Sequence, residues 1–208
     1  MHYDKKAIDQ LDRVTRLKII NSVTGVKPGN LIGTIGENGA TNLAVFSSII
    51  HLGSNPSLLG FISRPQTEEV GHTLRNILQT EYYTINHIHP EFVEKAHYTS
   101  AKFSSDVSEF DTCNLSEEYI NHFKAPFVQE SIFKMGLCFK EAVDIKLNGT
   151  VLVIGEIEEL IIADKAFVNE DIDLEASEGV GISGLNTYYS LKKIDSYPYA
   201  RLSEIPKF

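Results

Sequence analysis

The sequence predicts a mainly β protein whose short strands close as a barrel, with a few short helices inserted between them. From Leu17 onward, short apolar or alternating runs are separated by Gly, Pro and Asn, which is the pattern of strands and turns. A parallel α/β sheet would need a helix after nearly every strand, and helical spacing follows too few of these runs. A barrel is therefore expected, because closure removes exposed strand edges.

The elements follow from local patterns. Residues 1–14 predict a short helix, since Ile8, Leu11 and Val14 recur at three-residue spacing. The predicted strands share short apolar or alternating runs and cover 19–23, 31–35, 41–48, 57–63, 82–87, 131–141, 150–161 and 180–182. The pair Asn148-Gly149 predicts a type I′ hairpin that joins 132–145 to 151–161, because both turn residues tolerate positive φ.

Two segments interrupt the strand pattern with helical spacing. Residues 73–80 place Leu74, Ile77 and Leu78 on one face, and 90–98 begin with a proline that suits an early helical position. The glycine-rich run 33–39 has the wrong spacing for a nucleotide-binding loop and is followed by no helical pattern. It is interpreted as a hairpin turn.

Length and composition favour one domain over residues 1–208, with an N-terminal extension (1–16) and a C-terminal tail (185–208). Hydrophobic residues make up 42% and charged residues 23%, which excludes a disordered or fibrous protein. The apolar runs are far shorter than the roughly 20 residues that a bilayer span needs. The polar N-terminus lacks the apolar stretch of a signal peptide, so a cytoplasmic protein is expected.

The net charge of −9 argues against nucleic-acid and membrane partners, because such a surface repels phosphate backbones and anionic lipid. An anionic ligand would therefore need a local positive pocket. Cys113 and Cys138 form no CxxC motif and are expected to be reduced thiols.

The densest functional signal lies in residues 41–89. A helix predicted to start near Thr73 would present free N–H groups and partial positive charge to an anion, with Thr73 as its cap. Arg64, His72 and Arg75 would add positive charge near that point. Each feature also has a structural alternative: Thr73 can be a cap alone, and Arg64 can be a solvent-exposed charge at a strand end.

The same stretch contains, in order, the motifs Asn-Leu-Ala-x-Phe-Ser-Ser, a Pro-led strand ending near a cation, His-Thr-Leu-Arg-Asn-Ile, and Tyr-Thr-Ile-Asn. This order of motifs resembles the flavin reductase-like FMN-binding proteins, which include flavoredoxin. The resemblance covers about residues 17–168 and implies a split β-barrel of the Greek-key, FMN-binding type. It also implies a homodimer.

Position by position, the resemblance implies two groups of cofactor contacts. The isoalloxazine and ribityl group would be lined by Asn42, Ala44, Phe46, Ser47 and Ser48, and the FMN phosphate would be held by Arg64, His72, Thr73 and Asn76. This chain has Val45 where many members have Pro, and His72 where many have Asp; the second change is expected to make the site more cationic. No catalytic residue is identified, because hydride transfer to a flavin requires no side-chain acid or base.

The leading hypothesis is an FMN-binding oxidoreductase that passes electrons from NADH or NADPH to an acceptor, similar to flavin and ferric reductases. The main alternative is an electron carrier or flavin store without turnover, since the sequence has no recognisable nicotinamide motif. A third is an oxidase or oxygenase component. His87 and His89 would share one side of a strand, but no further ligand spacing supports a metal site, so none is expected.

Overall fold

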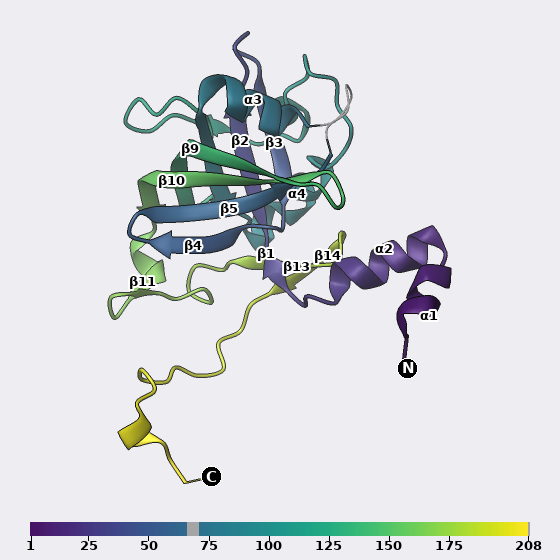
Figure 1. Ribbon diagram of the computed structural model, residues 1–208. Helices are drawn as coiled ribbons and strands as arrows, with labels where there is room; N and C mark the ends of the chain where they lie inside the picture. The colour runs from purple at the N-terminus through teal and green to yellow at the C-terminus, as the bar shows by residue number, and fades with distance from the viewer. Residues whose placement is uncertain (66–70, 208) are drawn as a thin grey trace.

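The computed structural model describes residues 1–65 and 71–207, and its centre is one antiparallel seven-stranded sheet (Figure 1). The strands, in spatial order, are β3 (Thr41–Phe46), β2 (Asn30–Ile35), β6 (Tyr82–His87), β9 (Phe133–Ile145), β10 (Thr150–Ile162), β5 (Ser57–Ser63) and β4 (Ile50–Ser54). All six neighbouring pairs are antiparallel. The fold is mainly β, as predicted, with 37% strand and 22% helix.

The sheet curls into a barrel that strand pairing does not close. Its two edge strands are β3 and β4. Where the sheet is open, the Ser48 hydroxyl accepts the Ile62 N–H at 3.1 Å and donates to the Ile62 carbonyl at 3.2 Å. This side-chain bridge ties the segment after β3 to β5. The expectation that closure removes every edge is wrong, and the edge of β3 stays available.

The remaining strands are short and form three small sheets. The first contains β1 (Lys27–Pro28), β13 (Val180–Ser183) and β14 (Thr187–Ser190); the others pair β7 (Glu117–Glu118) with β8 (Phe127–Val128), and β11 (Phe167–Val168) with β12 (Asp171–Ile172). Of these, the sequence predicts only β13. A two-residue strand is too short to show the alternation of apolar and polar residues from which strands are predicted.

The helices are α1 (Lys5–Gln10), α2 (Arg13–Ser22), α3 (His72–Thr80), α4 (Val93–Tyr98) and α5 (Glu109–Thr112), with 3₁₀ turns η1 (Pro90–Phe92), η2 (Asp164–Ala166) and η3 (Leu202–Glu204). The strand predicted at 19–23 is wrong, because it lies at the end of α2. The Asp12 side chain caps α2 by accepting from Val14 N–H and Thr15 N–H, both at 3.0 Å, and no Gly or Pro interrupts the helix. In residues 1–65 and 71–207, no helix has the length and apolar character needed to span a bilayer.

The β9–β10 hairpin confirms the predicted pairing but not the predicted turn. Register runs from Ile145 opposite Thr150 to Phe133 opposite Ile162, so the connection has four residues, 146–149. Only Gly149 has positive φ there, at 73°. Asn148 instead uses its side-chain oxygen to accept from the Thr150 N–H at 3.1 Å, which is an Asx-type contact.

Both faces of β2 are buried, and this divides the core into two layers. Ile32 faces the barrel interior with Phe61, Tyr83 and other apolar side chains. Leu31 faces the opposite side, where Phe92 and Phe110 pack with it beneath α4 and α5. This second layer places the loops around α4 and α5 against the outside of β3.

Gly155 and Tyr83 meet inside the barrel. Tyr83 is fully buried, and its hydroxyl has no hydrogen-bond partner among the described residues. A Cβ atom added at Gly155 would overlap this hydroxyl. Because the packed barrel gives the ring little room to move, position 155 requires glycine for packing reasons.

We expect Gly155→Ala to lower the free energy of unfolding by about 1–3 kcal/mol, as overpacked cores do. Tyr83→Phe removes the overlapping, unpaired hydroxyl, so Gly155→Ala should lose much less stability in that background. Urea unfolding of both single variants and the double variant measures the coupling. Equal losses in the two backgrounds would contradict this account.

Candidate functional site

The free edge of β3 forms one wall of the candidate site. The Leu43 N–H donates to Glu109 Oε2 at 2.9 Å, so it points away from β2. In an antiparallel strand, backbone groups two residues apart point the same way. The Val45 N–H therefore also points to the free edge, and it is a donor that a proline at this position would lack.

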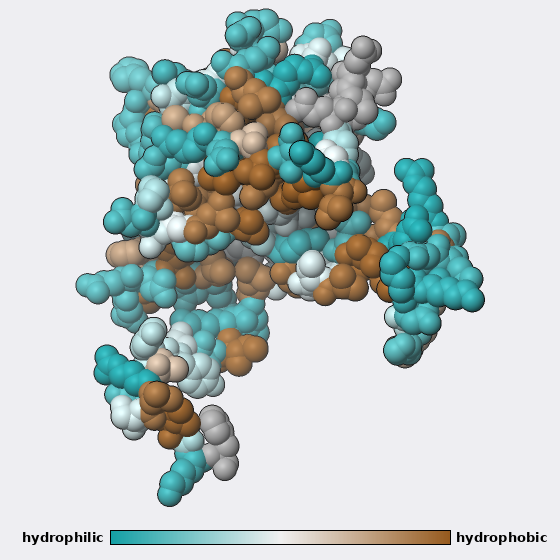
Figure 2. Space-filling model, in the orientation of Figure 1, coloured by the Kyte–Doolittle hydropathy of each residue, from teal (hydrophilic) through white to brown (hydrophobic). Residues whose placement is uncertain are grey.

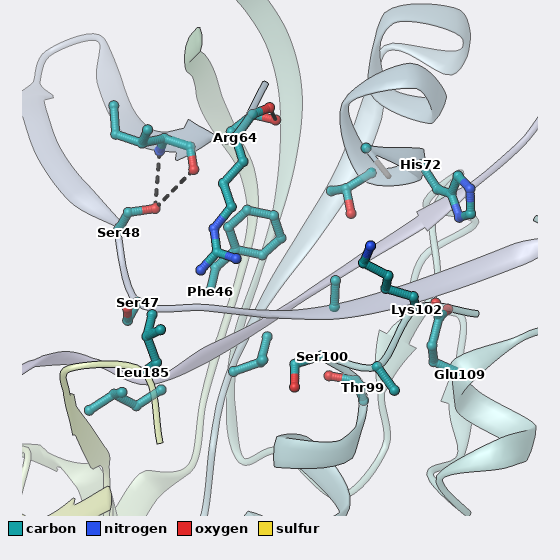
Figure 3. A pocket seen from close by; sticks show the side chains of 18 of the residues that line it. Phe46, Ser47, Ser48, Arg64, His72, Thr99, Ser100, Lys102, Glu109 and Leu185 are labelled. Carbon is teal, nitrogen blue, oxygen red and sulfur yellow. Dashed lines mark hydrogen bonds between the residues drawn. The ribbon is translucent and has the colours of Figure 1, made fainter. Parts of the chain in front are cut away.

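A cavity of about 610 Å³ lies along this edge (Figure 3). Eight of the nine cofactor-binding residues predicted from the sequence line it: Asn42, Ala44, Phe46, Ser47, Ser48, Arg64, His72 and Thr73. The ninth, Asn76, lines a smaller cavity of about 270 Å³ on the other side of the α3 start. The structure thus brings together residues from β3, the end of β5 and the first turn of α3.

The start of α3 differs from the expectation. Its N-cap is Gly71, which has φ 103° and makes no side-chain cap, so the prediction that Thr73 caps the helix is wrong. Thr73 is buried in the first turn, and its Oγ1 accepts from Asn42 Nδ2 at 3.2 Å. A left-handed cap residue favours glycine, whose lack of a Cβ removes the steric penalty. Thr73 therefore joins α3 to β3 rather than closing the helix end.

The predicted cations do not gather at one point. Figure 3 shows the Arg64 side chain extending over Phe46, whereas Lys102 extends toward α3 near His72. Arg75 does not line the larger cavity at all and lies on the smaller one. Among the described residues, neither Arg64 nor Lys102 makes an ion pair.

His72 does not make the site more cationic in the way expected from the sequence. Partial burial, and then the nearby charge of Arg75, lower the pKa of His72 below its ordinary value. Lowering the pKa favours the neutral imidazole at neutral pH. His72 is thus a less cationic part of the wall than expected, and Lys27, Arg64 and Lys102 supply the fixed positive charge.

Sequence reasoning missed the residues that close the cavity from outside the sheet. They come from the loop after α4 (Thr99, Ser100, Ala101, Lys102, Phe103), from α5 (Glu109) and from the β13–β14 turn (Leu185, Asn186), with Asn21, Lys27, Ile62, Ser63, Gly71, Thr150 and Ile182 completing the lining. Glu109 is nearly fully buried, and burial raises the pKa of its carboxyl group. Glu109 stands in a polar run between Asp106 and Asp111, so nothing in the sequence distinguishes it as a buried acid.

His87, His89 and the two cysteines lie in different surroundings and do not share a site. His87 stacks on Phe133 with ring centroids 4.0 Å apart, and burial lowers the pKa of His87 to about 4. His89 Nε2 lies 3.0 Å from the Ser177 carbonyl oxygen. Across residues 1–65 and 71–207, no three His, Cys, Asp or Glu side chains form a potential metal-binding group. Cys113 and Cys138 are both free.

Solved structures share this fold. A protein of Shewanella frigidimarina NCIMB 400, described as a candidate flavin reductase with a split barrel domain, is 46% identical, with a TM-score of 0.92 over 96% of this chain and 100% of that one. Nitrilotriacetate monooxygenase component B of Bacillus cereus is 16% identical, with a TM-score of 0.83 over 95% and 98% of the two chains. Flavoredoxin of Desulfovibrio vulgaris (Miyazaki F) is 17% identical, with a TM-score of 0.72 over 85% and 92%.

The two more distant structures support the fold alone, and that fold is the predicted split barrel. The sequence itself matches the model of the flavin reductase like domain over residues 26–173. This range includes all seven strands of the main sheet and every residue predicted to contact the cofactor. The chain therefore belongs to the flavin reductase-like domain family.

Proposed function

We propose that this chain binds FMN in the larger cavity and passes reducing equivalents from NADH or NADPH to an acceptor. The observation that carries the proposal is the cavity itself, which combines the edge of β3, an apolar wall and three cations, Lys27, Arg64 and Lys102, that make no ion pair within residues 1–65 and 71–207. Its volume of about 610 Å³ falls within the roughly 300–1,000 Å³ typical of small-molecule sites. Membership of the flavin reductase-like family supports a flavin as the occupant.

The residues present fit a flavin mononucleotide. A flat aromatic ring system suits the apolar wall that Ala44, Phe46 and Ile62 provide. Its polar edge requires hydrogen-bond donors, and the Val45 N–H on the free edge of β3 is one. A phosphate requires positive charge, and Arg64 and Lys102 each offer it at a different part of the cavity, without an ion-pair partner among the described residues.

In this proposal the flavin supplies the hydride and electron chemistry, and the chain supplies position and charge. Phe46 is fixed by edge-to-face packing on Phe61, with centroids 5.0 Å apart, so the wall beneath the ring is rigid. Ser48 holds the segment after β3 against β5 through Ile62. Glu109 fixes β3 at this same free edge by accepting the Leu43 N–H. These contacts keep the edge donor in place.

The protein should bind flavin in the larger cavity, and a nicotinamide nucleotide should reduce the bound flavin. Purified protein, reconstituted with FMN if necessary, should be yellow, and NADH or NADPH added without oxygen should bleach it at catalytic rates. A colourless protein that cannot be reconstituted would contradict the proposal. Bound flavin that neither nucleotide bleaches would instead indicate an electron carrier or flavin store.

Arg64→Ala should weaken FMN binding about 10- to 100-fold, which corresponds to the roughly 1.5–3 kcal/mol of a hydrogen bond to a charged group. Riboflavin, which lacks the phosphate, should bind the variant and the wild type equally. Fluorescence titration of both ligands measures the difference, with the exposed Arg201→Ala as the matched control. Equal losses for FMN and riboflavin would place Arg64 at the ring instead of the phosphate.

The homodimer is the second part of the proposal, and surface area supports it. A folded monomer of 23.2 kDa is expected to expose about 9,700 Å², whereas this chain exposes 13204 Å². Obligate dimers bury about 2,000–5,000 Å² in total, or about 1,000–2,500 Å² on each partner, so the excess of about 3,500 Å² is more than enough for one side of such an interface. Part of it belongs to α1, α2 and the segment 191–207, which extend away from the barrel (Figure 1). Neither helix has a buried residue.

An apolar sheet face lies beside these extensions. Leu52 of β4 and Leu152 of β10 lie on either side of Gly60 on β5, since a Cβ at Gly60 would be 3.0 Å from a methyl group of each. Ile62 shares this face by strand alternation, and it also lines the cavity. Figure 2 shows the apolar side chains as a band across this part of the molecule. A second copy seated here would border the flavin site.

Sedimentation or light scattering should therefore give a mass near twice 23.2 kDa. Leu152→Glu should shift the protein toward monomer and weaken FMN binding, because it places a charge in the apolar face. Leu147→Glu, in the exposed β9–β10 connection, should change neither property. A monomeric wild-type protein at micromolar concentration would overturn this part of the proposal.

A further inference from the structure

The smaller cavity is a second polar compartment that the FMN site does not use. Its volume is about 270 Å³. One face of α3 forms its inner wall, since His72, Arg75, Asn76 and Gln79 are spaced one helical turn apart. The β2–β3 turn, over residues 36–40, and Ser105 with Val107 form the other walls. Almost every contributing side chain is polar, so the compartment does not suit an apolar ligand.

The two cavities adjoin at the start of α3. Asn42 and His72 line both of them. These two side chains are also next to Thr73, which the family resemblance assigns to the flavin phosphate. A ligand that continues beyond that phosphate would pass Asn42 and His72 and enter the smaller compartment.

The chemistry of the compartment suits a second phosphorylated group. Arg75 is only partly exposed, and its guanidinium makes neither an ion pair nor a hydrogen bond within residues 1–65 and 71–207. The other charged residue of the lining, Glu37, is exposed at the turn. The positive charge of Arg75 also reaches His72, whose pKa it helps to lower. A guanidinium group with no other partner is well suited to bind a phosphate through two parallel hydrogen bonds.

The amide side chains beside Arg75 are held in place. Asn76 Nδ2 donates to Thr34 Oγ1 at 3.0 Å. A Cβ at Gly36 would lie 3.3 Å from Asn76 Oδ1 and 2.8 Å from Asn38 Oδ1, so the turn approaches α3 this closely only because residue 36 has no side chain. Oriented amide groups can hydrogen-bond the hydroxyls of a ribose or the edge of a base.

We propose that the smaller cavity binds the phosphorylated adenosine half of a dinucleotide whose other half occupies the larger cavity. This inference rests on the proposed flavin site and extends it. Two phosphate groups could meet Arg75: the adenosine 5′-phosphate of FAD, which FMN lacks, and the adenosine 2′-phosphate of NADPH, which NADH lacks. NADH shares the 5′-phosphate of FAD, so discrimination between the nicotinamide nucleotides rests on the 2′-phosphate alone. Arg75 is then a specificity-determining residue.

The test compares ratios of affinities. Fluorescence titration gives the dissociation constants of FMN and FAD for the wild type and for Arg75→Ala, and steady-state kinetics with FMN gives KM for NADH and NADPH. We expect Arg75→Ala to weaken FAD binding about tenfold, or to raise KM for NADPH about tenfold, while FMN and NADH stay within about twofold. The first result identifies FAD as the source of the adenosine, and the second identifies NADPH.

Controls separate this inference from the proposed function. Arg13→Ala removes an arginine from the projecting helix α2 and should alter no ratio. Ser105→Trp adds bulk at an exposed position of the same wall and should reproduce the selective loss without removing a charge. Normal FMN binding with unchanged ratios in both cavity variants would overturn the inference alone. A wild-type protein that binds no flavin would overturn the proposed function and this inference with it.

Discussion

The unpaired edge of β3 is the constraint on which the rest of the structure depends. An exposed strand edge attracts further strands, so a protein has to protect it. Here the protection comes from the buried carboxylate of Glu109, which takes the Leu43 N–H, and from the loop after α4, which stands across from the edge. The space left between them is the cavity. The same opening that leaves the barrel incomplete therefore supplies the candidate flavin site.

The charged residues that face this opening are mainly positive, whereas the net charge of the chain is negative. The protein carries a net charge of −9, yet Arg64, Lys102 and Arg75 face the two cavities without ion-pair partners among the described residues. His72 stands between the cavities, and its lowered pKa keeps repulsion among these groups small at neutral pH. An acidic surface discourages polyanions such as nucleic acids, while the local cations suit a small phosphorylated ligand. The first property follows from the composition of the chain, and the second follows from where its cations are placed.

The long strands and α3 could be predicted because their signals are local. Residues 57–63 and 82–87 alternate or run apolar between turn residues, and the structure forms β5 and β6 over the same spans. The secondary-structure predictions were wrong at two places where the sequence carries a second local signal. The isoleucines at 19 and 20 suggested a strand, but the Asp12 cap and an unbroken run made that segment α2. Asn148 suggested a type I′ turn, but its side chain bonds Thr150 instead.

The sequence by itself determined the fold class and the family resemblance, because short motifs encode strands and their order, and that resemblance assigned the residues of β3, β5 and α3 that line the cavity. Only the tertiary structure decided which of these residues share a compartment. Asn76 and Arg75 follow His72 within one helical turn, yet both lie on the smaller cavity. Glu109, Lys102 and Leu185 complete the larger one from distant segments. Side-chain direction and long-range packing set these positions, and neither is a function of sequence spacing alone.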